Sequence, residues 1–156
     1  MSVETSNKIL KITGIATIVI SIFVIIIGVL SILGSNLISV DAAAEQKLDK
    51  DLALGVMVFS LLGMMALFSG ILNLLEGIFS VRAANDNTKI MPAWIFAIIN
   101  LVMGVINIIT VVMDQSLENK GSTIVGTIIG LVITILIFYA ANTIKQAQNN
   151  NTIKQN

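Results

Sequence analysis

Few side chains in this chain could do chemistry inside a membrane, and Glu76 is the first of them. It is the one acidic residue within a long apolar run, and an ionisable group at membrane depth is by default a functional candidate. Three amides, at Asn73, Asn100 and Asn107, also lie in apolar runs. Because an amide without a partner in hydrocarbon costs on the order of several kcal/mol, each should be bonded inside protein. These four residues form the predicted intramembrane polar cluster.

Helical rise predicts which of these polar groups lie at the same depth. At about 1.5 Å per residue, Asn73 and Asn100 each lie roughly 13 Å from the turn that joins their helices, so we expect them to face each other. Glu76 lies roughly 9 Å from the same turn. Arg82 is about 240° round the helix from Glu76 and is a poor partner for it. Lys11, near the start of the first apolar run, is the candidate cation for an ion pair with Glu76.

The composition argues against most catalytic chemistry. The 156 residues include no Cys and no His, so disulfides, thiolates and imidazole bases or ligands are missing. The formal net charge is zero, which gives no basic field to attract nucleic acid. No nucleophile–base pair, metal cluster or phosphate-binding loop is visible. We therefore expect no enzymatic activity, no cofactor or metal, no nucleic-acid partner and no identifiable small-molecule ligand.

Four apolar runs predict a membrane protein. The chain is 56% hydrophobic and 12% charged, against about half and about a quarter in soluble domains. Each run can cross a hydrocarbon core of roughly 30 Å as a helix. The first run exceeds the roughly 7–15 apolar residues of a signal peptide, which favours a membrane span over cleavage near the AAA at 42–44. We predict an all-α, four-helix transmembrane bundle with antiparallel neighbours over residues 1–149, with spans at about 9–33, 52–81, 90–113 and 122–141, and a disordered polar tail at 150–156.

The positive charges predict the orientation. The two termini and the turn at 82–89 carry six Lys and Arg residues, whereas the other two loops carry three. The positive-inside rule therefore places both termini in the cytoplasm, in a multi-pass protein of a bacterial cytoplasmic membrane. The six are Lys8, Lys11, Arg82, Lys89, Lys145 and Lys154, and the three are Lys47, Lys50 and Lys120.

Small residues at helical spacing in each run are typical of helix-packing seams. Lipid gives helices no hydrophobic drive to associate, so close backbone approach and interhelical hydrogen bonds must supply it. A substrate path lined by the same small residues is the alternative. The predicted seam residues are Gly14, Gly28, Gly104 and the GxxxG pair Gly126 and Gly130.

The segment between the second and third runs, GIFSVRAANDNTKIMPAW at 77–94, carries a distinctive turn. Asn85, Asp86 and Asn87 are turn formers, since their side chains bond nearby backbone groups. Thr88 is expected to cap the next helix. Pro92 fits the first turn of that helix, where an amide hydrogen would be unpaired anyway.

The R-A-A-N-D sequence at 82–86 followed by K-I-x-P-x-W at 89–94 resembles a family of small uncharacterised four-span membrane proteins of bacteria. The resemblance covers this turn and the four-span layout; it implies a membrane fold but no activity, since none is assigned to that family. Small multidrug transporters also have four short helices and one membrane glutamate, but theirs lies in the first helix and Glu76 lies in the second. Claudins and tetraspanins have larger extracellular loops and cysteines.

These features favour a non-enzymatic membrane protein that acts through interaction, as a scaffold or an accessory subunit. Its partners would be the lipid bilayer and either a second copy of itself or another membrane protein. The alternative is a small proton- or cation-linked transporter or channel built around Glu76. A water-filled cavity reaching Glu76 would favour transport, whereas a dry, close-packed interior would favour the scaffold.

Overall fold

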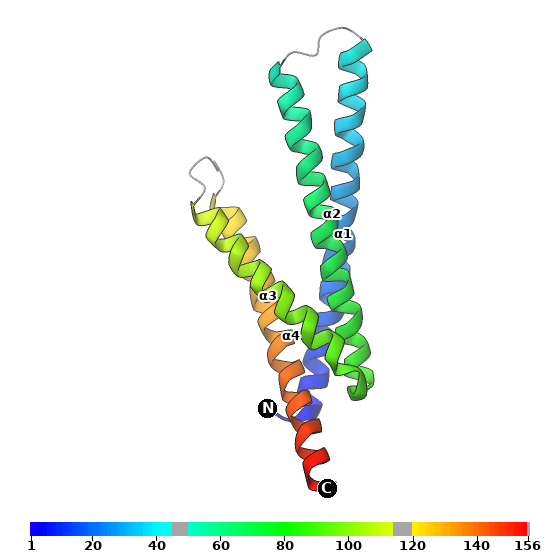
Figure 1. Cartoon of the computed structure of the whole chain (residues 1–156), viewed down its shortest axis with the longest axis vertical. Coiled ribbons are helices and arrows are strands. Elements are labelled where there is room, and N and C mark those ends of the chain that lie inside the picture. The colour runs from blue at the N-terminus through cyan, green and yellow to red at the C-terminus, as the bar shows by residue number, and fades with distance from the viewer. Residues whose placement is uncertain (45–49, 114–119, 156) are drawn as a thin grey trace. The chain divides into compact units, whose positions relative to one another are not determined.

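Within the residues that the structure describes, the chain is all-helical. The computed structural model describes residues 1–44, 50–113 and 120–155, with side chains for 1–38, 50–113, 121 and 124–150. The loops expected around 45–49 and 114–119 lie outside the described residues. The elements are α1 (Val3–Ala44), α2 (Lys50–Asn85), the short 3-10 helix η1 (Asn87–Lys89), α3 (Ile90–Met113) and α4 (Lys120–Gln155) (Figure 1). All four α-helices are long and apolar enough to cross a membrane, as predicted.

The first helix begins earlier than the predicted span because Ser2 caps it. The Ser2 hydroxyl accepts a hydrogen bond from the backbone N–H of Thr5 at 3.2 Å, which satisfies one of the unpaired amides of the first turn. Glu4 in that turn pairs with Lys8 at 2.8 Å, an arrangement that suits both the helix dipole and the spacing of one turn.

The last helix also extends beyond its predicted span. α4 runs to Gln155, whereas the sequence predicted a disordered tail from residue 150. The segment NTIKQAQ at 142–148 is rich in residues that tolerate helix well, Gln, Lys and Ala among them, so the helix continues past the apolar run.

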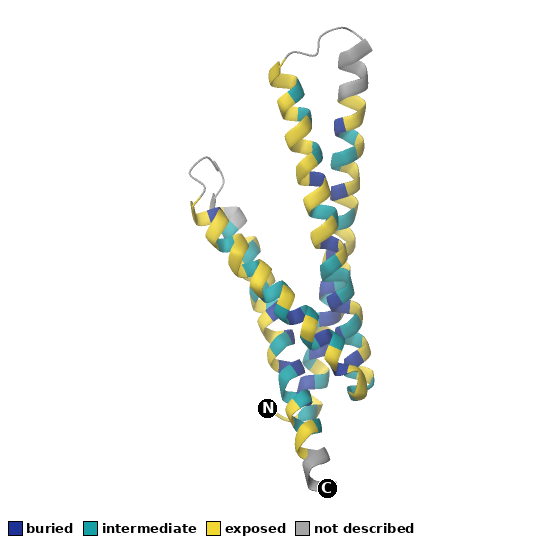
Figure 2. Cartoon of the chain, in the orientation of Figure 1, coloured by how far each residue is buried: buried dark blue, intermediate teal, exposed yellow. Residues whose placement is uncertain are grey.

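Much of the ribbon of the long helices is coloured as exposed in Figure 2, and many of the exposed residues are large and apolar. Phe23 is 62% exposed, and Met65 and Phe68 are each 63% exposed. Soluble proteins rarely expose contiguous apolar surface of this kind. These faces suit contact with lipid, and they support a multi-pass membrane protein.

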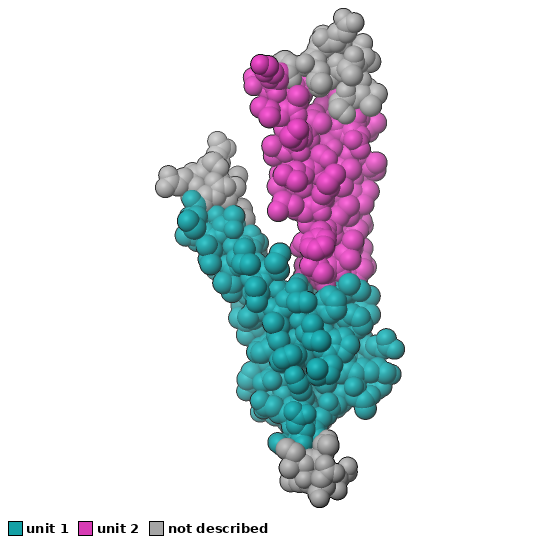
Figure 3. Space-filling view, in the orientation of Figure 1, with its two compact units in different colours: residues 1–18, 75–156 teal, residues 19–74 magenta. Residues whose placement is uncertain are grey.

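The helices divide into two compact units; the single domain over residues 1–149 stays a prediction. Unit 1 comprises residues 1–18 and 75–156, and unit 2 comprises residues 19–74 (Figure 3). The long helices α1 and α2 contribute to both units, whereas α3 and α4 belong to unit 1 alone.

In unit 2, α1 and α2 approach each other closely at glycines. A Cβ atom added to Gly63 would lie 2.9 Å from the carbonyl oxygen of Gly28, and one added to Gly28 would lie 2.9 Å from the carbonyl oxygen of Gly63. A Cβ atom on Gly70 would lie 2.7 Å from Cγ1 of Ile25. Only glycine lets two backbones approach this closely.

Unit 1 repeats this arrangement at Gly14 and Gly77. A Cβ atom on Gly77 would lie 2.8 Å from the carbonyl oxygen of Gly14. Gly14 and Gly28 were predicted to lie in seams, whereas Gly63, Gly70 and Gly77 were missed. Their interval of seven residues is the signal that would have identified them, because a heptad interval returns to the same helix face.

The core of unit 1 is built from small and branched side chains of all four helices. α3 packs antiparallel to α4: the Cβ position of Gly104 lies 3.1 Å from the side chain of Leu131, and the rings of Trp94 and Phe138 have centroids 6.4 Å apart. The alanine side chains of the core are small and apolar. They let the helix axes lie close together and add no polar atom that would need a hydrogen bond. The buried core consists of Leu10, Ala83, Ile90, Ala93, Ala97, Ile137, Ala140, Ala141 and Ile144.

Gly126 and Gly130 do not form the predicted packing seam within the described part of the chain. Both are exposed, and no atom lies within 4 Å of a Cβ atom built on either. The reason is the rotation of α4 about its axis, which presents Leu131 to Gly104 and turns the two glycines away from that contact.

The turn between α2 and α3 is organised by Asp86. Its carboxylate accepts hydrogen bonds from the backbone N–H of Thr88 at 3.1 Å and from the Thr88 hydroxyl at 2.6 Å, and it lies 2.7 Å from Nζ of Lys89. The capping residue is therefore Asp86 and not Thr88. The interactions with Lys89 first, and with Thr88 second, lower the pKa of Asp86 from 3.8 to about 2.

Gly77→Ala is expected to destabilise the protein, because its Cβ would collide with the Gly14 carbonyl oxygen. Overpacking of this kind costs about 1–3 kcal/mol. Gly55→Ala is the matched control on the same helix, since no atom lies within 4 Å of its Cβ position, and it should stabilise by roughly 0.5–1 kcal/mol. Unfolding in mixed detergent measures both. A Gly77→Ala protein as stable as the Gly55→Ala protein would contradict the close packing of α1 against α2 at Gly14 and Gly77.

Asp86→Asn should make stability less dependent on acid pH. Folding lowers the pKa of Asp86, so its carboxylate contributes stability above pH 3.8, and that contribution is lost as the pH falls from 3.8 towards about 2. Asparagine still caps a helix but carries no charge. Thermal unfolding of both proteins at neutral pH and below pH 3.8 is the measurement. The prediction fails if acid destabilises the two proteins equally.

Candidate functional site

The candidate site is the carboxyl group of Glu76, near the end of α2 in unit 1. The residue is 1% exposed. Its Oε2 atom accepts a hydrogen bond from the amide nitrogen of Asn100 on α3 at 2.6 Å. Two members of the predicted polar cluster therefore come together across α2 and α3.

The other carboxyl oxygen is left without a partner. Oε1 of Glu76 and the hydroxyl of Ser80 are both buried and have no hydrogen-bond partner among the described residues. The two residues are one turn apart on α2, so they lie on the same face of the helix. An unsatisfied buried polar group costs about 1–3 kcal/mol, and such groups are rare enough in native proteins to need an explanation.

No cation lies against Glu76 in the described part of unit 1. Lys11 is exposed, so the predicted ion pair between Lys11 and Glu76 is not formed there. Lys11 follows the fully buried Leu10 and is rotated by about 100° from it, which turns its long side chain to the surface. Arg82 is also exposed, and Nζ of Lys145 lies 3.3 Å from the centre of the Trp94 ring.

This environment favours an uncharged carboxyl group. An ionised carboxylate in apolar surroundings is costly unless it is paired with a cation or bonded to several donors. Within the described part of the chain, Glu76 has a single donor, Asn100. A neutral acid can accept at Oε2 and donate from Oε1. The chemistry open to the site is therefore the binding and release of a proton and hydrogen bonding. Among the described residues, no group of three or more acidic side chains could hold a metal ion.

The remaining members of the predicted cluster lie elsewhere. Asn73 is half-buried and belongs to unit 2, so its predicted pairing with Asn100 stays a prediction. Asn107, on α3, is exposed. Ser80 was not included in the predicted cluster, although its position four residues after Glu76 is a signal that places both side chains on one face.

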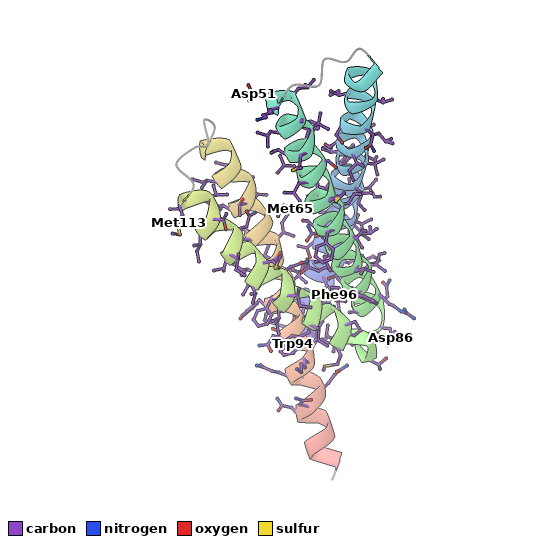
Figure 4. All side chains as sticks on the ribbon, turned by 45° about the horizontal axis from the view of Figure 1, so that its top comes forward. Asp51, Met65, Asp86, Trp94, Phe96 and Met113 are labelled. Atoms are coloured by element: carbon purple, nitrogen blue, oxygen red, sulfur yellow. The ribbon has the colours of Figure 1, made fainter. Side chains whose placement is uncertain are left out.

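A second group of side chains, also missed, holds α4 against the turn. The ammonium group of Lys145 lies over the ring of Trp94, which also contacts Phe138. Trp94 is labelled in Figure 4. The side-chain amide of Gln148 donates to the carbonyl oxygen of Asn87 in η1. The sequence signal was weak, because it consists of one aromatic residue near a membrane interface and one lysine in a distant segment.

No family model, curated protein or solved structure matches the chain. The resemblance to small four-span bacterial membrane proteins therefore stays a prediction, and function has to be argued from the site itself.

Asn100→Leu should destabilise the protein by about 1–3 kcal/mol, because it leaves both Glu76 oxygens buried without a protein donor. Asn107→Leu is the matched control on the same helix; its amide is exposed, so the same substitution should be close to neutral in the monomer. Unfolding in detergent, at a protein concentration low enough to exclude association, compares the two. Equal destabilisation by both substitutions would contradict the importance of the Asn100–Glu76 bond.

Proposed function

We propose that this chain is a non-enzymatic integral membrane protein that works through helix–helix contacts, as a scaffold or accessory subunit, and that it associates with a second copy of itself. The observation that supports this most is the exposed amide of Asn107 on α3. It lies within a helix that is long and apolar enough to span a membrane. An amide facing hydrocarbon is costly until another polar group meets it.

The surface around Asn107 suits a second copy. Gly104 and Leu131 mark the facing sides of α3 and α4. Counted from these contacts at about 100° per residue, Asn107 and Gly130 turn to the same side of the α3–α4 pair. Open space at Gly126 and Gly130 permits close approach of another helix. An amide is both donor and acceptor, so in a two-fold symmetric pair Asn107 can bond to Asn107 of the other copy.

Single-cysteine crosslinking tests this association, because the natural chain contains no cysteine. Asn107→Cys should form a disulfide-linked dimer in membranes under mild oxidation. Val102→Cys is the control: it is also exposed on α3 but lies about 140° round the helix from position 107. Equal crosslinking at both positions, or a monomer in every mild detergent and membrane tested, would overturn the proposed self-association.

We further propose that both termini and the α2–α3 turn lie in the cytoplasm of a bacterial cell, on the strength of the Lys and Arg distribution. Cysteines introduced at Asp51 and Asn149, both exposed, should react with membrane-impermeant reagents from opposite sides of the membrane. Asn149→Cys should be protected in intact cells and Asp51→Cys should be labelled. Labelling of Asn149→Cys from outside would reverse the orientation.

A second candidate function is a small proton- or cation-linked transporter that uses Glu76. It is favoured by one observation, the buried Oε1 atom that has no partner among the residues with described side chains, since intramembrane acids commonly mark ion pathways. In proteoliposomes, Glu76→Gln should preserve folding and abolish any pH-dependent flux. Flux that is proton-coupled in the natural protein and lost in Glu76→Gln would displace the scaffold proposal, whereas flux that survives this substitution would reject Glu76 as its carrier.

A further inference from the structure

The buried side-chain atoms without hydrogen-bond partners are concentrated in unit 1. Among the described residues they are Oδ1 of Asn7, Oε1 of Glu76, Oγ of Ser80, Oδ1 of Asn87 and Nε1 of Trp94. Three of them, at Glu76, Ser80 and Asn87, follow one another along α2 and into the turn after it. Of the other two, Asn7 comes from α1 and Trp94 from α3.

The register of α1 against α2 places Asn7 between Ser80 and Asn87. Gly14 faces Gly77, so Asn7, one heptad before Gly14, is level with position 84, one heptad after Gly77. Glu76, Ser80 and Asn7 therefore follow each other at levels 76, 80 and 84 of α2, and Asn87 comes next along the chain, in η1 after α2 has ended. At about 1.5 Å per residue, the three levels on α2 are separated along the helix axis by roughly 6 Å each.

This spacing matches a chain of single waters. A water that makes two hydrogen bonds of about 2.8 Å joins polar atoms roughly 5.5 Å apart. Buried waters typically satisfy protein groups that would otherwise be unpaired. Glu76 is 1% exposed and Ser80 is 0% exposed, so neither can be satisfied by bulk solvent.

Each described charged group on the elements around Glu76 is either paired elsewhere or exposed. No cation therefore binds its carboxyl group, and the ligand that remains for this group is a proton. On α1, Lys8 pairs with Glu4 and Lys11 is exposed. On α2, Arg82 is exposed. In η1, Lys89 pairs with Asp86, and on α4 Lys145 lies over Trp94. One carboxyl oxygen and one hydroxyl are also too few oxygens for a dehydrated metal cation, which prefers about six.

We propose that Glu76 carries a proton on Oε1 and exchanges it with water at the α2–α3 turn, through a file of buried waters held by Ser80, Asn7 and Asn87. In exchange, the carboxyl group gives its proton to the neighbouring water, which passes a different proton outward along the file. A proton returning along the same file then reprotonates Oε1, so no net charge is left behind. This site and its route are independent of whether the chain is a scaffold or a transporter.

Infrared spectroscopy of the full chain in detergent tests the proposal directly. The difference spectrum between the natural protein and Glu76→Gln isolates the C=O stretching band of a protonated carboxyl group. This band should be present at neutral pH and should shift when the sample is transferred to D2O. Ser80→Ala removes one holder of the file and should slow that shift by about tenfold or more, a ratio that corresponds to about 1.4 kcal/mol in the barrier.

Ser69→Ala is the matched control, because Ser69 is an exposed serine on the same helix; its exchange rate should equal that of the natural protein. Asn7→Leu provides a second interruption of the file if Ser80→Ala does not fold. Absence of the protonated band at neutral pH would overturn the proton site. Equal exchange rates in the file variants and in Ser69→Ala would overturn the route. If the protein shows no pH-dependent flux in proteoliposomes but the C=O band of protonated Glu76 shifts rapidly in D2O, this inference is supported and only the transport function is rejected.

Discussion

Backbone contact between α1 and α2 at glycine determines how unit 1 can be built. With no side chain at Gly14 or Gly77, each helix lies against the carbonyl oxygen of the other. In lipid, where apolar burial contributes little to helix association, dispersion contact over such a close interface is the main attraction available. The same approach brings Ser80 against α1, because its Cβ lies 3.0 Å from a Cβ position on Gly14. The burial of the polar face of α2 is therefore a consequence of the glycine seam.

Within this closely packed unit, a polar contact and an aromatic contact join α2 to α3. Glu76 and Asn100 join α2 to α3 by a short hydrogen bond, and the rings of Phe79 and Phe96, with centroids 5.3 Å apart, join the same helices through apolar contact. An apolar residue at position 76 would pack without any unpaired atom. Retaining an acid there is costly in stability, and such a cost is typical of positions where function and stability compete.

The sequence was sufficient to predict the helices and insufficient to predict how they turn about their axes. Long apolar runs define spans because every backbone polar group must be bonded within the helix in hydrocarbon. The sequence also predicted the depth of each residue along its helix, and the predicted depths of Glu76 and Asn100 were close to each other. The rotation of α4, which exposes Gly126 and Gly130, depends on how Leu131 fits Gly104, and no local pattern encodes that fit. The cap at Asp86 was missed because Thr88 is an equally acceptable capping residue by type.

The stacking of Lys145 on Trp94 gives the protein an optical reporter of its own. The chain has a single tryptophan, and its ring lies beneath the ammonium group of Lys145 from the C-terminal half of α4. Indole emission is sensitive to a nearby positive charge and to water. The fluorescence of the unlabelled protein therefore follows one event, the separation of the end of α4 from α3, without interference from any other indole.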